Sequence, residues 1–313
     1  MVDVSVIILT RNTCAQTVEA VASACNSQDA LTKELFVVDN GSTDDSPRVI
    51  PARFPAVRYD ATGCNLGFAR AVNRAARQAS GEWLLLLNSD ARLQPDALGI
   101  AVAWMRAHPD CGIAGAQLLN ADGSRQNSIA NFPTLATELL NKSLLRRLFP
   151  RRFPGKERSF NEPVDVETVV GAFFLVRRKV WDALGGLDER YYFFLEETDF
   201  CLEARKSGTC VVHLPEVKVW HGQGQTAKKV PAGARIEYWR SRYTYFRKQH
   251  GRFASFLLRA GLLVRLLVNT LVSIAITAVS LGCAAKWRQK CGVYLALCGW
   301  HLRGCPDGVG LPR

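Results

Sequence analysis

Acidic residues are almost absent from the last quarter of this 313-residue chain. Residues 228–313 hold 15 Lys and Arg but 2 Asp and Glu, whereas residues 1–227 hold 25 and 26 and are nearly neutral. This scarcity excludes internal charge balance in the tail and indicates an anionic partner, either membrane headgroups or nucleic acid. The formal net charge of +12 therefore describes the tail and says little about the body.

Two other features are missing. None of the ten cysteines forms a CxxC pair. The first ten residues include an acid and run directly into a strand pattern, without the basic n-region, h-region and cleavage site of a secretory signal. We therefore expect a body that is not exported, with its cysteines as buried apolar residues or inert thiols in a reducing cytosol. Cys291, Cys298 and Cys305 recur every seven residues near His301, and we interpret them as a helical stripe rather than a zinc site.

The composition excludes disorder and a fibrous repeat. With 48% apolar and 22% charged residues, the chain is long enough to bury a full core. No internal repeat is evident. The sequence changes character near residue 236, so we predict a globular domain over residues 1–235 and a basic, apolar helical region over residues 236–313.

Two segments, one uncharged and one basic, are candidates for contact with a membrane. Leu266 to Ala285 gives 20 residues without a charge, enough to cross a bilayer core of roughly 30 Å. Positive charge lies on both flanks, and polar residues share one helical face, so we favour a helix at the membrane interface over a span. Residues 127–163 are rich in proline and in Lys and Arg, and form either a mobile or membrane-facing segment or a solvated basic helix and loop.

The body alternates strand and helix patterns. Apolar runs at 4–9, 35–38 and 83–87 predict strands, and apolar spacing at 14–25 and 68–79 predicts helices. This alternation indicates an α/β fold with a mainly parallel central sheet flanked by helices. Further along, the patterns predict a strand over 169–176, helices over 179–184 and 197–207, and paired strands over 211–214 and 217–220.

Polar clusters follow three of the predicted strands, at residues 10–13, 39–44 and 88–90. Ligands of such sheets bind outside the carboxyl ends of the strands, so these clusters are expected to converge. Asp39 and Asn40 could accept hydrogen bonds from a base or ribose, and Asp90 could hold a divalent cation. The alternative is that these acids are turn formers or helix caps.

Three acids lie within residues 196–199, and a histidine follows the last predicted strand. The acids either complement the helix N-terminus or include a general base held in partly apolar surroundings. His221 is either structural or a metal ligand through a neutral ring nitrogen.

Seven blocks in order resemble the inverting family 2 glycosyltransferases of GT-A (Rossmann-like) fold, and most closely their bacterial rhamnosyltransferase-like branch. They cover much of residues 3–250. The blocks are VSVIILTRN (4–12), VVDNGSTD (37–44), NLGF (65–68), LLLLNSD (84–90), GAFFLVRR (171–178), GGLDE (185–189) and EETDFC (196–201).

The resemblance implies a role for each matching residue. Glu197 matches the catalytic base, Asp90 matches the last acid of the metal-binding motif, and His221 matches a histidine that completes the metal site. Positions that grip the nucleotide are matched by Thr10, Asn12, Asp39 and Asn65. The substrate site is also expected to include Asn40, Gly67, Asn88, Glu196 and Asp199.

The chain departs from the family pattern at two of these positions. Asn88 stands where many relatives have an acid, which predicts modest metal affinity. Glu197 stands where many have Asp, so the base could instead be Glu196 or Asp199.

The resemblance implies transfer of a sugar from a nucleotide-diphosphate sugar, best dTDP-L-rhamnose, with Mg²⁺ or Mn²⁺ as cofactor. The acceptor would be a lipid-linked cell-surface glycan at the cytoplasmic side of the bacterial inner membrane. Alternatives are a UDP-hexose or UDP-furanose donor, or a non-catalytic scaffold that binds nucleotide sugars or glycans. Nucleic acid is not an expected partner, because the tail lacks a recognition motif and carries a long uncharged stretch.

Overall fold

The computed structural model describes residues 2–150, 152–153, 158–222, 230–281 and 283–312. The chain forms two compact units. The first comprises Met1–Phe132, Gly155–Tyr192 and Glu196–Gln223, and the second comprises Pro133–Pro154, Phe193–Leu195 and Gly224–Arg313. The second unit thus includes two earlier segments besides the C-terminal region, and the domain boundary after residue 235 stays a prediction.

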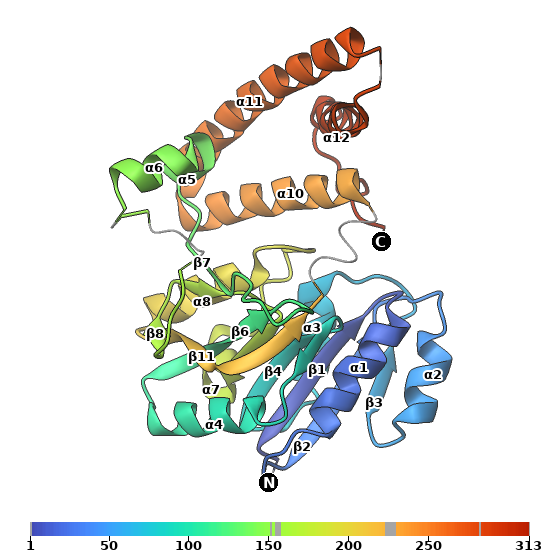
Figure 1. Ribbon diagram of the computed structural model, residues 1–313, viewed down its shortest axis with the longest axis vertical. Coiled ribbons are helices and arrows are strands. Elements are labelled where there is room, and N and C mark those ends of the chain that lie inside the picture. Colours follow the sequence, from blue (N-terminus) through green and yellow to red (C-terminus); the bar gives the residue numbers. More distant parts are fainter. Residues whose placement is uncertain (1, 151, 154–157, 223–229, 282, 313) are drawn as a thin grey trace. The chain divides into compact units, whose positions relative to one another are not determined.

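A nine-stranded sheet forms the centre of the first unit (Figure 1). Its order is β3-β2-β1-β4-β10-β6-β11-β5, and β8 also pairs with β11. The first four strands are parallel, β10 is antiparallel to both neighbours, β6 and β11 are parallel, and β5 and β8 are antiparallel to β11. The predicted α/β fold with a central sheet flanked by helices is confirmed. The strands are Val4–Thr10 (β1), Lys33–Asp39 (β2), Arg58–Ala61 (β3), Trp83–Asn88 (β4), Ala91–Leu93 (β5), Cys111–Leu119 (β6), Val164–Asp165 (β8), Phe173–Arg177 (β10) and Cys210–His221 (β11).

Alternate residues of the central strands bury against opposite faces of this sheet. In β1, Val6 and Ile8 join one core while Ile7 joins the other, and in β4 Leu85 and Leu86 divide in the same way. Helices α1, α2 and α4 cover the first face, and α3, α7 and α8 cover the second (Figure 1). Burial on both faces explains why these strands are continuous apolar runs. The helices are Cys14–Cys25 (α1), Ser46–Arg53 (α2), Phe68–Ala76 (α3), Ala97–Ala107 (α4), Arg178–Leu184 (α7) and Glu196–Lys206 (α8).

Two strand predictions need correction. The strand expected over 169–176 is divided into β9 (Thr168–Val169), which pairs with β7 (Ile129–Ala130), and β10, which begins at Phe173. The two strands expected over 211–214 and 217–220 are one strand, β11, whose register against β6 shifts between Leu214 and Lys218. Pro215 lies inside this shift and has no amide hydrogen for the ladder, so the sequence signals a break where the chain only bulges.

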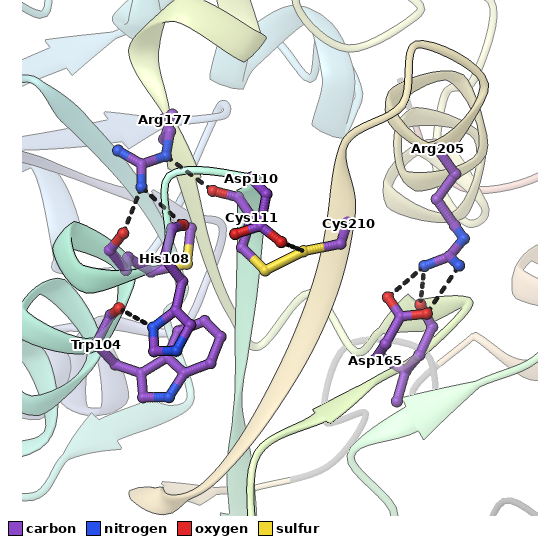
Figure 2. The surroundings of a disulfide bond; sticks show 10 residues. Trp104, His108, Asp110, Cys111, Asp165, Arg177, Arg205 and Cys210 are labelled. Atoms are coloured by element: carbon purple, nitrogen blue, oxygen red, sulfur yellow. Dashed lines mark hydrogen bonds and ion pairs between the residues drawn. A yellow bond between two sulfur atoms is a disulfide. The ribbon is translucent and has the colours of Figure 1, made fainter.

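A disulfide joins Cys111 and Cys210, the first residues of the neighbouring strands β6 and β11 (Figure 2). Next to it, the Arg177 guanidinium donates to the carbonyl of Cys111 at 2.8 Å and to that of His108 at 3.1 Å. The interpretation of all ten cysteines as free thiols is therefore wrong for this pair. The two residues lie 99 positions apart, and only strand pairing brings them together.

Helices make up most of the second unit. They are Leu135–Leu139 (α5), Lys142–Leu148 (α6), Pro231–Gln249 (α10), Gly251–Val279 (α11) and Ala285–Leu302 (α12). Four aromatic residues of α10 are buried, namely Trp239, Tyr243, Tyr245 and Phe246. A buried ion pair joins Arg242 of α10 to Glu138 of α5, which ties the segment before α6 to the C-terminal helices.

Helix α11 buries the hydroxyl side chains of Ser255, Thr270 and Ser273 and exposes many of its apolar residues. On the buried side, the hydroxyls of Thr270 and Ser273 donate to carbonyls of their own helix at 2.7 and 2.9 Å. The exposed residues include Phe253, Phe256, Val264, Leu267, Val268, Leu271 and Val272.

By length and composition alone, α11 is long and apolar enough to cross a membrane, and 22% of its most apolar 18-residue window is buried. The uncharged stretch from Leu266 to Ala285 is not a single helix, however. Helix α11 ends at Val279, and Ala285 already begins α12. A span of about 20 residues that ends at Val279 would therefore begin near residue 260 and include Arg265.

Candidate functional site

The loops that follow β1 and β2 are joined by hydrogen bonds. Asn12 has a φ of 53°, its Oδ1 accepts the N–H of Thr43 at 2.7 Å, and its own N–H donates to Ser42 Oγ at 3.0 Å. The side chain of Thr10 is buried, and its carbonyl accepts the N–H of Asn40 at 2.9 Å. These bonds hold the loops together at the carboxyl ends of the two strands.

Asp39, the last residue of β2, has a buried and fixed carboxylate. Its Oδ1 accepts the N–H of Ser42 at 2.8 Å, and its Oδ2 accepts the hydroxyl of Tyr59. Burial, the hydrogen bond to Asp39 and the charge of that residue raise the pKa of Tyr59, so the phenol stays protonated as a donor. The carboxylate therefore keeps one orientation without a ligand.

An amide network links the end of β2 to the start of α3. Asn40 donates through Nδ2 to Asn65 Oδ1 at 2.7 Å and accepts the N–H of Leu66 at 2.8 Å. Gly67, the N-cap of α3, has a φ of 84°, and a Cβ there would lie 2.6 Å from the ring of Tyr192. Glycine at this position allows the backbone before α3 to approach Tyr192 closely.

Asp90 and His221 face one another because β5 pairs with the end of β11. His221 lies opposite Ala91 in that ladder, so Asp90 stands beside it. The distance from His221 Nε2 to Asp90 Oδ1 is 3.5 Å, and the two side chains are 10% and 14% exposed. Burial lowers the pKa of His221, and the charge of Asp90 opposes that shift.

This pair suits a divalent cation. A carboxylate oxygen and a neutral imidazole nitrogen are both metal ligands, and both are fixed here on a strand or its turn. A Cβ at Gly222 would lie 3.3 Å from Asp90 Cβ, so glycine leaves room next to the carboxylate. Asp90 and His221 supply two ligands, and substrate phosphate oxygens are the usual further ones for such ions.

Glu197 lies in the first turn of α8, next to the loop before β10. A Cβ at Gly171 would lie 3.6 Å from Glu197 Oε1, so the carboxyl group rests against this glycine. Burial raises the pKa of Glu197, while backbone amides of Glu197 itself and Gly171 offset part of the shift. Ala172 accepts the N–H of Asn88 at 3.2 Å, which places Glu197 close to the end of β4.

The other two acids of this turn have different surroundings. Burial and the charge of Glu197 raise the pKa of Glu196 well above the usual range, and Glu196 Oε2 is buried without a partner among the described residues. Asp199 is buried and accepts the hydroxyl of Tyr191 at 3.1 Å. Glu197 is thus the least enclosed of the three.

The structure brings the predicted residues to one edge of the sheet, at the ends of β1, β2, β4 and β11. A hydrogen bond of 3.1 Å from Thr13 to Ser89 joins the loop after β1 to the turn that holds Asp90. The sequence did not indicate Tyr59 or Gln126 as part of this edge. Gln126 is 95 positions from His221, whose ring it contacts, and no local pattern marks such a pair.

Comparison with known proteins agrees with this geometry. The profile of the family described as "Glycosyl transferase family 2" matches residues 5–185. An N-acetylglucosaminyl-diphospho-decaprenol L-rhamnosyltransferase from Mycobacterium tuberculosis is 28% identical over 256 residues, which is 74% of this chain and 83% of that protein.

Solved structures share the fold at low sequence identity. A mannosyltransferase from Pyrobaculum calidifontis, in complex with GDP-Man and Mn²⁺, gives a TM-score of 0.53 at 16% identity and covers 97% of this chain and 87% of its own. GalNAc-T7, with UDP, GalNAc and Mn²⁺, gives 0.56 at 14% identity over 80% of this chain and 51% of its own.

Proposed function

Because this chain belongs to glycosyl transferase family 2 and is a GT-A glycosyltransferase, we propose that it moves a sugar from a nucleotide-diphosphate sugar to a lipid-linked glycan, with inversion of configuration. The observation that carries this proposal is the placement of Glu197 beside the end of β4. A candidate base and a candidate cation site thus lie at the same edge of the sheet.

The donor would lie along the ends of β1, β2 and β4. Asp39 is held by Tyr59 and Ser42, so its orientation is set before a base or ribose arrives. Thr10, Asn12 and Asn65 belong to the joined loops that would surround the nucleotide. Preorganised polar groups of this kind cost little reorganisation when the ligand binds.

Asp90 and His221 would hold a Mg²⁺ or Mn²⁺ ion together with diphosphate oxygens. When bound, this ion offsets the negative charge that develops on the leaving diphosphate. Asn88 adds a neutral oxygen at the end of β4 in place of an acid. We therefore propose a metal site that depends on the nucleotide for much of its affinity.

Glu197 would act as the general base. Its carboxylate accepts the proton of the acceptor hydroxyl while that oxygen forms a bond to the anomeric carbon. The bond from this carbon to the donor phosphate breaks on the opposite face, and its electron pair leaves with the diphosphate. A single displacement inverts the configuration, and no covalent sugar–enzyme intermediate forms.

The rhamnosyltransferase relative makes dTDP-L-rhamnose the first donor to test. That relative's name also describes an acceptor on a decaprenyl diphosphate, which supports a lipid-linked acceptor here. The exposed apolar residues of α11 and the basic C-terminal region fit an enzyme that works at a membrane surface. We propose that this surface is the cytoplasmic side of the bacterial inner membrane.

Calorimetric titration with dTDP, UDP and GDP, each with and without Mn²⁺ or Mg²⁺, tests the donor site first. Metal-dependent binding that prefers dTDP supports the proposal, and a preference for UDP moves the donor to a UDP-hexose or UDP-furanose. Absence of binding to all three would instead support a scaffold without transferase activity. Asp90→Ala should abolish metal-dependent binding and leave the melting temperature nearly unchanged.

A further inference from the structure

Gln126 is a buried side chain that contacts the candidate metal ligand His221 on the side of the ring opposite Asp90. It follows β6 on the loop that returns along that strand, where its N–H donates to the carbonyl of Leu118 at 2.7 Å. It is 7% exposed. Its Oε1 lies 3.1 Å from His221 Nδ1, the ring nitrogen that faces away from Asp90.

The orientation of the Gln126 amide follows from the oxygens around its nitrogen. Nε2 lies 2.6 Å from the carbonyl of His221, 3.2 Å from that of Leu119 and 2.9 Å from Asn120 Oδ1. Asn120 is itself oriented, because the Ser124 hydroxyl donates to Asp122 Oδ1 at 2.6 Å and must therefore accept from Asn120 Nδ2 at 2.8 Å. A reversed Gln126 amide would place an oxygen against these three acceptors, so Nε2 must be the group that faces them.

This orientation decides which ring nitrogen of His221 carries the proton. Gln126 Oε1 can only accept, so His221 Nδ1 must be the N–H donor in the neutral imidazole. The lone pair then lies on Nε2, which is 3.5 Å from Asp90 Oδ1. Two electron-rich atoms face each other with no proton between them, an arrangement that a cation would stabilise.

We propose that Gln126 is a positioning residue: it holds His221 as the Nδ1–H tautomer and so directs the Nε2 lone pair, with Asp90, at a divalent cation. This inference rests on the proposed metal role of Asp90 and His221. In metal-ligating histidines the second ring nitrogen commonly donates to a protein acceptor, and loss of that acceptor typically lowers metal affinity by about 10–100-fold.

The tautomer can be measured without metal or substrate. Two-bond ¹H–¹⁵N spectra of the metal-free protein distinguish a protonated Nδ1 from a protonated Nε2, and His221→Gln identifies the signal among the five histidines. Wild type should show His221 protonated on Nδ1 only, and Gln126→Met should show a mixture or the other tautomer. A wild-type His221 protonated on Nε2, or a spectrum that Gln126→Met leaves unchanged, would overturn the proposal.

Mn²⁺ binding in the presence of the preferred nucleoside diphosphate gives the second readout. Gln117→Met is the matched control, because Gln117 is a buried amide of the same hairpin that bonds the Gln126 carbonyl at 2.9 Å without touching His221. We expect Gln126→Met to weaken Mn²⁺ by about 10–100-fold and Gln117→Met by much less. Equal losses in the two variants would reduce Gln126 to a structural role.

These two readouts separate the possible failures. Wild-type protein that shows the Nδ1–H tautomer but binds no Mn²⁺ with any nucleotide contradicts the metal part of both proposals. Protein that binds Mn²⁺ with the Nε2–H tautomer contradicts the role of Gln126 alone and leaves the proposed function standing.

Discussion

Glu196 and Glu197 are adjacent at the start of α8, but their carboxyl groups have different surroundings. Burial raises the pKa of both groups, but Glu196 is enclosed, with one oxygen that has no partner among the described residues, whereas Glu197 is partly exposed and rests against Gly171. A base must reach the hydroxyl from which it takes the proton, so the less enclosed group suits that role better. This contrast favours Glu197 over Glu196 as the base.

Replacement of Glu197 by Gln should lower kcat by about 10²–10⁴-fold, because the side chain keeps its size but cannot accept the proton. Donor binding by calorimetry should stay within about 3-fold of wild type. Glu203→Gln, at a partly exposed position of the same helix where the carboxylate pairs with Lys206, serves as the control with near-normal kcat. Wild-type turnover by Glu197→Gln would exclude it as the base.

The pH dependence of kcat follows from the direction of the same pKa shift. The rate should fall as pH decreases through the pKa of Glu197, and burial moves that acidic limb above 4.5, the ordinary value for glutamate. Initial rates measured from acid to neutral pH locate the limb. A limb at or below the ordinary value would contradict a buried base.

Glycines with positive φ fix the course of the backbone before helix α3. Gly67 is the N-cap of helix α3, has a positive φ and lies so close to Tyr192 that no side chain fits there. Gly63 also has a positive φ of 75°, but no atom lies within 4 Å of the position that its Cβ would take. Substitutions at these two glycines therefore distinguish the free-energy cost of a left-handed backbone from the cost of a steric clash with Tyr192.

Gly67→Ala should reduce the free energy of unfolding by about 2–4 kcal/mol, since strain in the left-handed region adds to overpacking against Tyr192. Gly63→Ala carries only the conformational cost, about 1–2 kcal/mol. Urea denaturation of both variants gives the comparison. Equal losses would show that the contact with Tyr192 contributes nothing to the folded state.

Helix α11 presents an apolar surface whose role can be tested by adding charge. Leu267 and Leu271 are 57% and 67% exposed, so Leu267→Glu/Leu271→Glu should fold normally and bind phosphatidylglycerol vesicles more than about 10-fold more weakly than wild type. Ala52→Glu/Ala56→Glu adds the same charge at exposed positions of the first unit. Vesicle sedimentation measures the binding of each variant. If both variants bind as tightly as wild type, α11 does not contact the membrane.

At the scale of the whole molecule, the disulfide and the candidate site lie at opposite ends of the same strands. Cys210 begins β11 and His221 ends it, while Cys111 begins the parallel neighbour β6. The crosslink therefore constrains the sheet of the first unit without touching the residues proposed to bind the donor. Its contribution should be to stability and not to binding.

Reduction should lower the free energy of unfolding by about 2–5 kcal/mol, because the bond closes a loop of 99 positions in the unfolded chain. Nucleotide affinity should not change. Titration in denaturant should find eight free thiols before reduction and ten after it. Cys25→Ser, which removes an exposed free thiol, is the control and should respond to reductant as wild type does. If reductant changes the melting temperature of neither protein, the bond does not stabilise the fold.

The sequence by itself determined the layers of the first unit and most of the candidate site. Continuous apolar runs such as 83–87 can only be buried on both faces, and parallel strands must gather their polar carboxyl-terminal residues at one edge. Local patterns therefore marked Asp39, Asp90 and Glu197 as candidates, because each follows or begins a strongly patterned element, and the resemblance to the family 2 blocks supplied their roles.

Only the tertiary structure decided what holds these residues. The pairing of β5 with β11 places Asp90 next to His221, and the pairing of β6 with β11 brings Cys111 to Cys210. Gln126 and Tyr59 act through contacts with residues far along the chain, and side chains that meet only across strands leave no periodic signal in sequence. The reason is physical: local patterns record burial and backbone preference, while the partner of a polar group is chosen by the packing of elements distant in the chain.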